Sequence, residues 1–166
     1  MGRVTTFVYD SWGRVERVHT PRFPAPNFAR RFEYDTHHRV TRMVAPASHP
    51  EDTVSYTYDA VGKVLTEENL GYRRVYDYDD LERLTSVTLV YQLNPSLGSK
   101  TFLVTYDDDA YGSLETVTDP ELLVTTYGYV AGERLSSITH SGPGAPLTPG
   151  PSAQFEYDST GRIKRW

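Results

Sequence analysis

One phrase recurs along the chain: an aromatic residue, any residue, Tyr-Asp, two variable residues, Gly-Arg and an aliphatic residue. It is written FVYDSWGRV at residues 7–15 and FEYDSTGRI at residues 155–163, near the two ends of the 166-residue chain. A phrase that served catalysis would need to occur only once, whereas a phrase that serves architecture should also recur between the ends.

Seven copies of the phrase align on its tyrosine. The anchoring tyrosines are Tyr9, Tyr34, Tyr58, Tyr78, Tyr106, Tyr129 and Tyr157. They are 20 to 28 residues apart, and a large apolar residue stands two positions before each of them. Residues two positions apart point to the same face of a strand. The pattern therefore predicts seven repeats of one β-hairpin.

The Asp-x-x-Gly step predicts the turn of each hairpin. Aspartate is favoured at the first position of a type I turn, where it bonds back to the backbone, and glycine takes the left-handed conformation that closes a three-residue loop. In this register the acidic residue faces the basic one, and such cross-strand pairs contribute about 0.2–1 kcal/mol each. The predicted turn residues are Asp10, Gly13 and Arg14; Asp35 and Arg39; Asp59, Gly62 and Lys63; Asp79 and Arg83; Gly112; Gly132 and Arg134; and Asp158, Gly161 and Arg162.

Some copies depart from this turn. His38 and Glu82 occupy the glycine position; histidine tolerates left-handed geometry, whereas Glu82 should cost stability or force another turn. Gly132 stands one place earlier than its counterparts, which suits a type II turn. The fifth copy carries two extra residues, so we expect the loop at 107–112 to bulge outward.

Aliphatic residues follow each turn at two positions. The first set is Val15, Val40, Val64, Leu84, Leu114, Leu135 and Ile163. The second set, three residues later, is Val18, Met43 (with Val44 beside it), Val87, Val117 and Ile138. Because three is not the period of a strand, two alternatives stay open: a bulge lies between the two positions, or the second residue faces the other side of the sheet.

Composition agrees with an all-β chain. The 13 tyrosines favour pleated surfaces, and the 12 glycines and 11 prolines mark turns. A net charge of −5 argues against a nucleic-acid partner. No apolar run is long enough to span a bilayer, and the first residues lack the layout of a signal peptide. The absence of cysteine excludes a disulfide scaffold without fixing the compartment.

The repeats fill residues 1–166, which we predict to be a single repeat region without a helix. The Gly- and Pro-rich connection at 141–151 is predicted to be a surface loop, and a linker before the seventh hairpin is the alternative.

No residue pattern predicts catalysis. The acidic run at 107–109 lacks the alternating ligands of a calcium loop. His37 and His38, with His49 nearby, could suggest a metal site, but adjacent histidines point in different directions. Nucleophile elbows, phosphate-binding glycine loops and zinc spacings are absent from the sequence. We therefore predict no enzyme activity, no metal and no cofactor.

The repeated phrase, together with VTDPE leading into YGY, resembles the RHS repeat, also called the YD repeat. The match extends from Val4 to Trp166. The resemblance implies an all-β fold: a curved antiparallel strip of about seven hairpins that forms a segment of a hollow β-shell. In bacterial RHS and insecticidal Tc toxins that shell encloses a C-terminal toxic polypeptide, and animal teneurins display a similar barrel at the cell surface.

The resemblance implies a structural segment of a large secreted or cell-surface protein, with further YD repeats and an enclosed toxin polypeptide as partners. The alternative is a carbohydrate-binding or cell-adhesion module, because tyrosines flanked by Asp, Arg and Asn make a surface on which sugars stack. We also expect association through the first and last strands, since unpaired strand edges are templates for another chain.

Overall fold

The computed structural model describes residues 4–25, 27–92, 98–130, 134–143 and 153–165. Apart from one 3₁₀ turn, η1 (Pro50–Asp52), the regular structure of these residues is all β. None of them forms a helix with the length and hydrophobicity of a membrane span. The strands are β1 (Thr6–Tyr9), β2 (Val15–His19), β3 (Arg30–Tyr34), β4 (Val40–Val44), β5 (Val54–Tyr58), β6 (Val64–Glu68), β7 (Tyr72–Tyr78), β8 (Leu84–Gln92), β9 (Ser99–Asp108), β10 (Leu114–Thr118), β11 (Val124–Val130), β12 (Arg134–Ser141), β13 (Ala153–Gln154), β14 (Glu156–Tyr157) and β15 (Ile163–Arg165).

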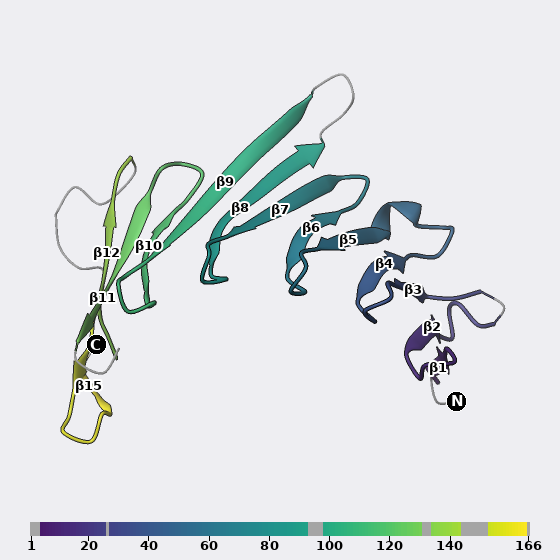
Figure 1. The fold of residues 1–166 in the computed structure, drawn as a ribbon, viewed down its shortest axis with the longest axis horizontal. Coiled ribbons are helices and arrows are strands. Elements are labelled where there is room, and N and C mark those ends of the chain that lie inside the picture. The colour runs from purple at the N-terminus through teal and green to yellow at the C-terminus, as the bar shows by residue number, and fades with distance from the viewer. Residues whose placement is uncertain (1–3, 26, 93–97, 131–133, 144–152, 166) are drawn as a thin grey trace. The chain divides into compact units, whose positions relative to one another are not determined.

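The strands follow one another across the sheet in the order of the sequence. Strands β1 to β13 form one sheet, and β14 and β15 form a second, two-stranded sheet (Figure 1). The seven predicted hairpins are β1–β2, β3–β4, β5–β6, β7–β8, β9–β10, β11–β12 and β14–β15. The predicted all-β fold of repeated antiparallel hairpins is confirmed, with the difference that the seventh hairpin has a sheet of its own.

The chain divides into two compact units. Unit 1 comprises Met1–Tyr76 and Leu89–Thr101, and unit 2 comprises Asp77–Thr88 and Phe102–Trp166. In unit 1 the strands pair one after another from β1 to β7, and in unit 2 they pair from β9 to β13. The same kind of hairpin therefore builds both units.

A bulge beside each turn explains the spacing of the aliphatic residues. In the first hairpin Tyr9 pairs with Val15 and Val8 pairs with Arg17, so one residue of β2 is left over. This shift brings Val18 opposite Phe7, on the face that carries the tyrosine. The same shift occurs in β3–β4, β5–β6 and β11–β12. Of the two alternatives, the bulge is confirmed.

The fifth hairpin differs from the prediction. Its turn begins at Asp109, where the Gly112 amide donates to the Asp109 carbonyl oxygen at 3.0 Å, so the two extra residues lengthen β9 and no outward loop forms. Asp108 pairs with Leu114 and therefore takes the tyrosine position, while Tyr106 pairs with Val117 and takes the place of Phe7. The alignment on Tyr106 was wrong because the turn, and not the tyrosine, sets the register.

Few side chains of either unit are fully buried. Among the described hydrophobic residues, Ala45 and Val54 are buried, with 3% and 8% of their surfaces exposed. Most strand residues are half-buried. A thin sheet of this kind gains its stability from many small contacts between successive repeats, as solenoid proteins do.

Candidate functional site

One hydrogen-bond pattern recurs at the turns. In the first hairpin the Gly13 amide donates to the Asp10 carbonyl oxygen at 3.0 Å, and the Asp10 amide donates to the Arg14 carbonyl oxygen at 2.8 Å. The Asp10 carboxylate accepts the amides of Trp12 and Arg14, both at 2.9 Å. The pattern returns in the turns that begin at Asp35, Asp59, Asp79, Asp109 and Asp158.

The residue that closes the turn has a positive φ whether or not it is glycine. Gly62 and Gly161 have φ of 100° and 82°, and His38 and Glu82 have φ of 64° and 68°. Glu82 therefore keeps the common turn and does not force another one, at the cost of a left-handed conformation worth about 1–2 kcal/mol for a non-glycine residue. Gly132 lies outside the described residues.

The turn carboxylates are held in their charged form. The Arg39 amide, which donates to Asp35 at 2.9 Å, is the largest cause that lowers the pKa of Asp35, and the Arg39 guanidinium adds to it at 2.7 Å. The same two groups of Arg83 lower the pKa of Asp79. Asp35 and Asp79 are each bound by the amide and the guanidinium of an arginine in their own turn.

A tyrosine joins a hairpin to the one before it. Its hydroxyl donates to the backbone carbonyl oxygen of the first aliphatic residue of the preceding hairpin, and burial raises the pKa of three such tyrosines, Tyr34, Tyr58 and Tyr129. The oxygen–oxygen distances are 2.7 Å for Tyr34 and Val15, 2.5 Å for Tyr58 and Val40, 2.8 Å for Tyr129 and Leu114, and 2.7 Å for Tyr157 and Leu135.

An arginine of the preceding turn covers the ring of the same tyrosine. The guanidinium carbons lie 4.3 Å from the ring centre for Arg14 over Tyr34, 4.7 Å for Arg39 over Tyr58 and 4.9 Å for Arg134 over Tyr157. We call this combination of arginine, tyrosine ring and accepting carbonyl the latch. Such cation–π contacts contribute about 0.5–1 kcal/mol at exposed sites.

The latch also reaches the next turn. The Arg39 guanidinium donates to the Asp59 carbonyl oxygen at 2.9 Å, and an Arg14 nitrogen lies 3.0 Å from a ring nitrogen of His38. His38 stands at the glycine position, and its ring meets that of Trp12 edge-on. This histidine therefore has a role in joining hairpins.

The latch is modified in unit 2. Asp108 stands at the tyrosine position of the fifth hairpin, and the Arg83 guanidinium lies 3.3 Å from its carboxylate instead of over a ring. The same guanidinium also pairs with Asp79 at 2.6 Å. Arginine therefore bridges successive hairpins with either an aromatic or an acidic partner.

A polar cluster on β6 and β7 was not foreseen. Glu67 pairs with Tyr56 across the strands and occupies the position that the second aliphatic set fills elsewhere. Its carboxylate accepts the Tyr72 hydroxyl, the Arg74 guanidinium at 2.8 Å and the Tyr76 hydroxyl at 3.3 Å. Because the side chain is only 17% exposed and holds three donors, Glu67 ties β6 to β7. The gap in the second aliphatic set was the signal for this cluster.

The cluster raises the pKa of its phenols. Burial, followed by the hydrogen bond to Glu67, raises the pKa of Tyr72 to about 12. Burial and the Glu67 charge raise the pKa of Tyr56 and Tyr76. Phenols of this kind remain neutral donors at physiological pH, which suits a cluster that holds two strands together.

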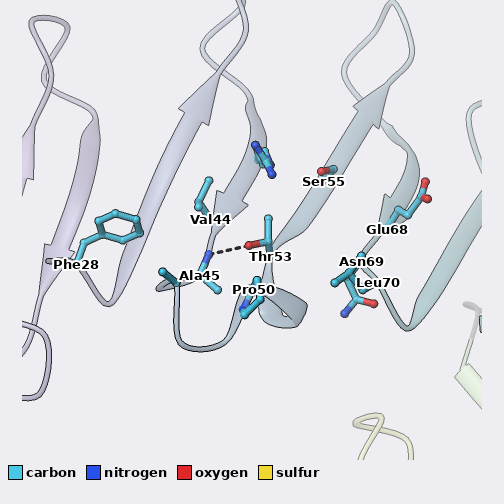
Figure 2. Close-up of a pocket in the computed structure, with 11 residues that line it drawn as sticks. Phe28, Val44, Ala45, Pro50, Thr53, Ser55, Glu68, Asn69 and Leu70 are labelled. Atoms are coloured by element: carbon cyan, nitrogen blue, oxygen red, sulfur yellow. Dashed lines mark hydrogen bonds between the residues drawn. The ribbon is translucent and has the colours of Figure 1, made fainter.

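Unit 1 also contains an open pocket of about 720 Å³ formed by β4 to β6, their connections and Phe28, which precedes β3. Figure 2 shows Phe28 on one side and Leu70 on the other. Between them the Ala45 amide donates to the Thr53 hydroxyl oxygen at 3.0 Å, so this polar pair is satisfied within the wall. Its polar lining residues include Thr53, Ser55 and Glu68, and Ser55 pairs with Glu68 across β5 and β6.

The described histidines and acids do not gather into a metal site: no group of three or more lies close enough to hold an ion. The carbohydrate alternative stays a prediction without support from this geometry. One face of the rings of Tyr34, Tyr58 and Tyr157 is covered by arginine, and their hydroxyls already donate to the backbone.

Comparison with known proteins rests on structure, since neither a family model nor a curated protein sequence matches the chain. The crystal structure of TcdB2-TccC3-TEV superposes with a TM-score of 0.70 over 96% of this chain, at 12% identity. The Photorhabdus luminescens Tc holotoxin pore superposes with a TM-score of 0.58 over 98%, at 17% identity.

The chain spans 9% and 10% of the length of those two proteins. Identities this low relate the fold alone. The resemblance to the shell-forming repeats of Tc toxins, predicted from the repeated phrase, is therefore confirmed for the fold: this chain has the hairpin-repeat architecture that segments of the Tc toxin proteins have.

Proposed function

We propose that this chain is a non-catalytic wall segment of a hollow β-shell, in a larger secreted or cell-surface protein that encloses a toxic polypeptide. The observation that carries the proposal is the latch. It uses the repeated tyrosine and arginine of the phrase to fasten one hairpin to the next at three junctions, those of Tyr34, Tyr58 and Tyr157. In this proposal the repeated tyrosine and arginine hold neighbouring hairpins of the wall together.

Three further observations support the wall. The carboxylates of Asp35 and Glu67 are bound within a turn and within the Glu67 cluster. The fold is that of segments in Tc toxin structures, one of which is described as a holotoxin pore. The chain spans about a tenth of those proteins, as a wall segment would.

Protease protection tests the enclosure. The reading frame that contains these residues is expressed with the polypeptides encoded before and after them, and the product is digested under native conditions. We expect one internal polypeptide to survive until the wall is unfolded by urea. Digestion of every encoded polypeptide at the rate that it shows when expressed alone would contradict the proposal.

Latch variants provide the specific readout. Tyr34→Ala and Tyr58→Ala remove latch rings, so the enclosed polypeptide should become digestible at lower urea concentrations. Tyr111→Ala is the matched control, because the Tyr111 side chain lies in a turn with 86% of its surface exposed. Equal protection in all three variants would show that the latch does not hold the wall closed.

A further inference from the structure

The arginine of one turn lies beside the residue that closes the next turn. At the first junction an Arg14 guanidinium nitrogen lies 3.0 Å from a ring nitrogen of His38. Where the closing residue is glycine, the guanidinium nitrogen lies close to the position that a Cβ would take. Those distances are 4.0 Å for Arg39 and Gly62, 3.8 Å for Arg83 and Gly112, and 3.2 Å for Arg134 and Gly161. We call the closing residue that receives an arginine the seat.

The second junction shows what an arginine does at its seat. The Arg39 guanidinium lies over the Tyr58 ring at 4.7 Å and donates to the Asp59 carbonyl oxygen at 2.9 Å. Asp59 begins the turn that Gly62 closes, since the Gly62 amide donates to that same carbonyl oxygen. A side chain at the closing position would therefore stand beside the arginine of the preceding hairpin.

A turn on the opposite edge of the sheet separates this contact from turn geometry. The turn from Asp119 to Leu122 has the same hydrogen bonds and joins β10 to β11, but Leu123 follows it in place of arginine. Leu122 closes it at φ 67°, so the turn alone admits a large apolar residue. On the latch edge, the described closing residues are glycine or a side chain that can accept a hydrogen bond: Gly13, His38, Gly62, Glu82, Gly112 and Gly161.

His38 is a seat that supplies its own acceptor. Because an arginine can only donate, the His38 ring nitrogen accepts from Arg14. The same guanidinium pairs with Asp10 at 2.7 Å and lies 4.3 Å from the centre of the Tyr34 ring. The Trp12 ring meets the His38 ring edge-on at 5.3 Å. Histidine adopts the left-handed conformation less readily than glycine, and in exchange its ring gives Arg14 a partner on the second hairpin.

We propose that the seat residue determines how tightly a hairpin joins the one before it, because it decides whether the preceding arginine can reach the next turn. A glycine leaves room for the guanidinium, and His38 binds it. This inference rests on the proposed role of the latch in the wall. It assigns the residue before the turn arginine a part in recognition between hairpins, in addition to its part in its own turn.

The seat with the shortest distance gives the strongest test. In the product of the whole reading frame, Gly161→Ala would place a Cβ 3.2 Å from the Arg134 nitrogen, so the guanidinium must move. The Phe155 amide donates to the Ser136 carbonyl oxygen at 2.9 Å and reports on this junction. Hydrogen exchange followed by mass spectrometry should show that this amide exchanges about tenfold faster in the variant.

Gly62→Ala is the matched control, because it introduces the same side chain at another left-handed glycine. Its Cβ would lie 4.0 Å from Arg39, an ordinary contact distance, so the turn is strained while the arginine keeps its place. The Ala45 amide donates to the Thr53 hydroxyl oxygen at 3.0 Å and reports on that junction. Its exchange should stay within about twofold of the rate in the unsubstituted product.

Removing the arginine separates the seat from the strain of the turn. In an Arg134→Ala background the Cβ of Gly161→Ala has no guanidinium to displace. The double variant should therefore expose the Phe155 amide no more than Arg134→Ala alone does. If the glycine served only its own turn, the two effects would add. Additive effects, or an unchanged Phe155 amide in Gly161→Ala, would overturn the inference.

His38→Ala tests the seat that binds its arginine, and it supplies the result should Gly161→Ala fail to fold. The Ala29 amide donates to the Val18 carbonyl oxygen at 2.7 Å across the first junction, and its exchange should become about fivefold faster. His37→Ala is the control, because the His37 ring nitrogen lies 3.5 Å from the hydroxyl of its neighbour Thr36. Equal exchange of the Ala29 amide in the two variants would refute the role of His38.

This outcome is separable from that of the proposed function. A product that protects an internal polypeptide but shows additive effects at Gly161 and Arg134 would refute the seat and leave the wall intact. Coupled effects at those two residues in a product that protects nothing would refute the enclosure and leave the seat intact.

Discussion

Two junctions between hairpins show how an arginine at the same turn position contacts different partners. In unit 1, Arg39 lies over the Tyr58 ring at 4.7 Å, and the Tyr58 hydroxyl donates to the Val40 carbonyl oxygen. In unit 2, Arg83 meets the Asp108 carboxylate at 3.3 Å. Both arginines also pair with the aspartate of their own turn. At these two junctions the turn and its arginine are the same, and the tyrosine is the part that is replaced.

The two junctions should differ in energy. The ring of Tyr58 is half-buried and adds apolar contact to its cation–π contact and hydrogen bond. The Arg83 and Asp108 side chains are 35% and 17% exposed, and an ion pair of this kind contributes about 0–1 kcal/mol. The aromatic junction is therefore expected to be the stronger one.

Removing the partner of each arginine tests most directly whether the two junctions differ in energy. Tyr58→Ala should lower the free energy of unfolding by about 2–3 kcal/mol, less than for a fully buried ring, because the ring is half-buried. Asp108→Ala should lower it by no more than about 1 kcal/mol. Urea unfolding of the two variants measures both values. Equal losses would mean that the two junctions are equivalent and that the ring has no special role.

A change in the turn tests whether the turn dominates the register. Strand β10 lies between two turns of the same pattern, one closed by Gly112 at φ 85° and the other by Leu122 at φ 67°. Gly112→Leu should lower the free energy of unfolding by about 1–2 kcal/mol, because a residue with a side chain disfavours the left-handed backbone conformation. Its added Cβ would meet only Arg83 at 3.8 Å, so the loss is conformational.

Leu122→Gly is the reciprocal variant. Leu122 is 65% exposed, so its replacement removes little packing and relieves the same strain. In thermal and urea unfolding, the free energy of unfolding should rise by up to about 1 kcal/mol. The rise is limited because glycine has more conformational freedom in the unfolded chain. A loss in both variants would mean that the two turns are not equivalent.

The turns were predictable because their chemistry is local. Asp10 and Gly13 stand three positions apart, and rules for a four-residue turn suffice to place them. The number of hairpins and the antiparallel pairing follow from those turns. The latch was not predictable, since a tyrosine and the carbonyl that it bonds are 15 to 22 residues apart and the sequence does not state which neighbour covers which ring.

Two errors show where the sequence signal misleads. The fifth hairpin was aligned on Tyr106 because the tyrosine is conspicuous, although Asp109 and Gly112 already marked a turn two residues later. The Glu67 cluster was missed because it depends on a residue that breaks the repeat. In both places the exception became visible only when the strands were paired.

Restoring the ring would sharpen the comparison between the junctions. Asp108→Tyr places a tyrosine opposite Leu114 and within reach of Arg83. If the turn fixes the register, the new ring should complete a latch and raise the free energy of unfolding by about 1 kcal/mol. Asp107→Tyr is the control, because Asp107 pairs with Thr116 one register position away. If Asp107→Tyr raised the free energy of unfolding and Asp108→Tyr did not, the pairing of β9 with β10 would differ from the one described.

The smallest expected effect concerns the constant part of both junctions, the turn carboxylates. The Arg39 amide and guanidinium lower the pKa of Asp35 in the folded chain, and those of Arg83 lower the pKa of Asp79. A lowered folded pKa means that the stability is present above the unfolded value of about 3.9 and is lost as pH falls through the folded value. The free energy of unfolding measured in urea should therefore be constant from pH 7 to 5 and fall below pH 4.

Two variants separate the charge from the turn. Asp35→Asn keeps a hydrogen-bond acceptor but removes the charge, so the difference in the free energy of unfolding between pH 7 and pH 3 should shrink. Asp80→Asn is the control, because Asp80 is exposed and lies one residue beyond Asp79, and it should leave that difference unchanged. An unchanged difference in Asp35→Asn would show that the turn is held by its backbone hydrogen bonds alone, and that the ionised carboxylate adds nothing to either junction.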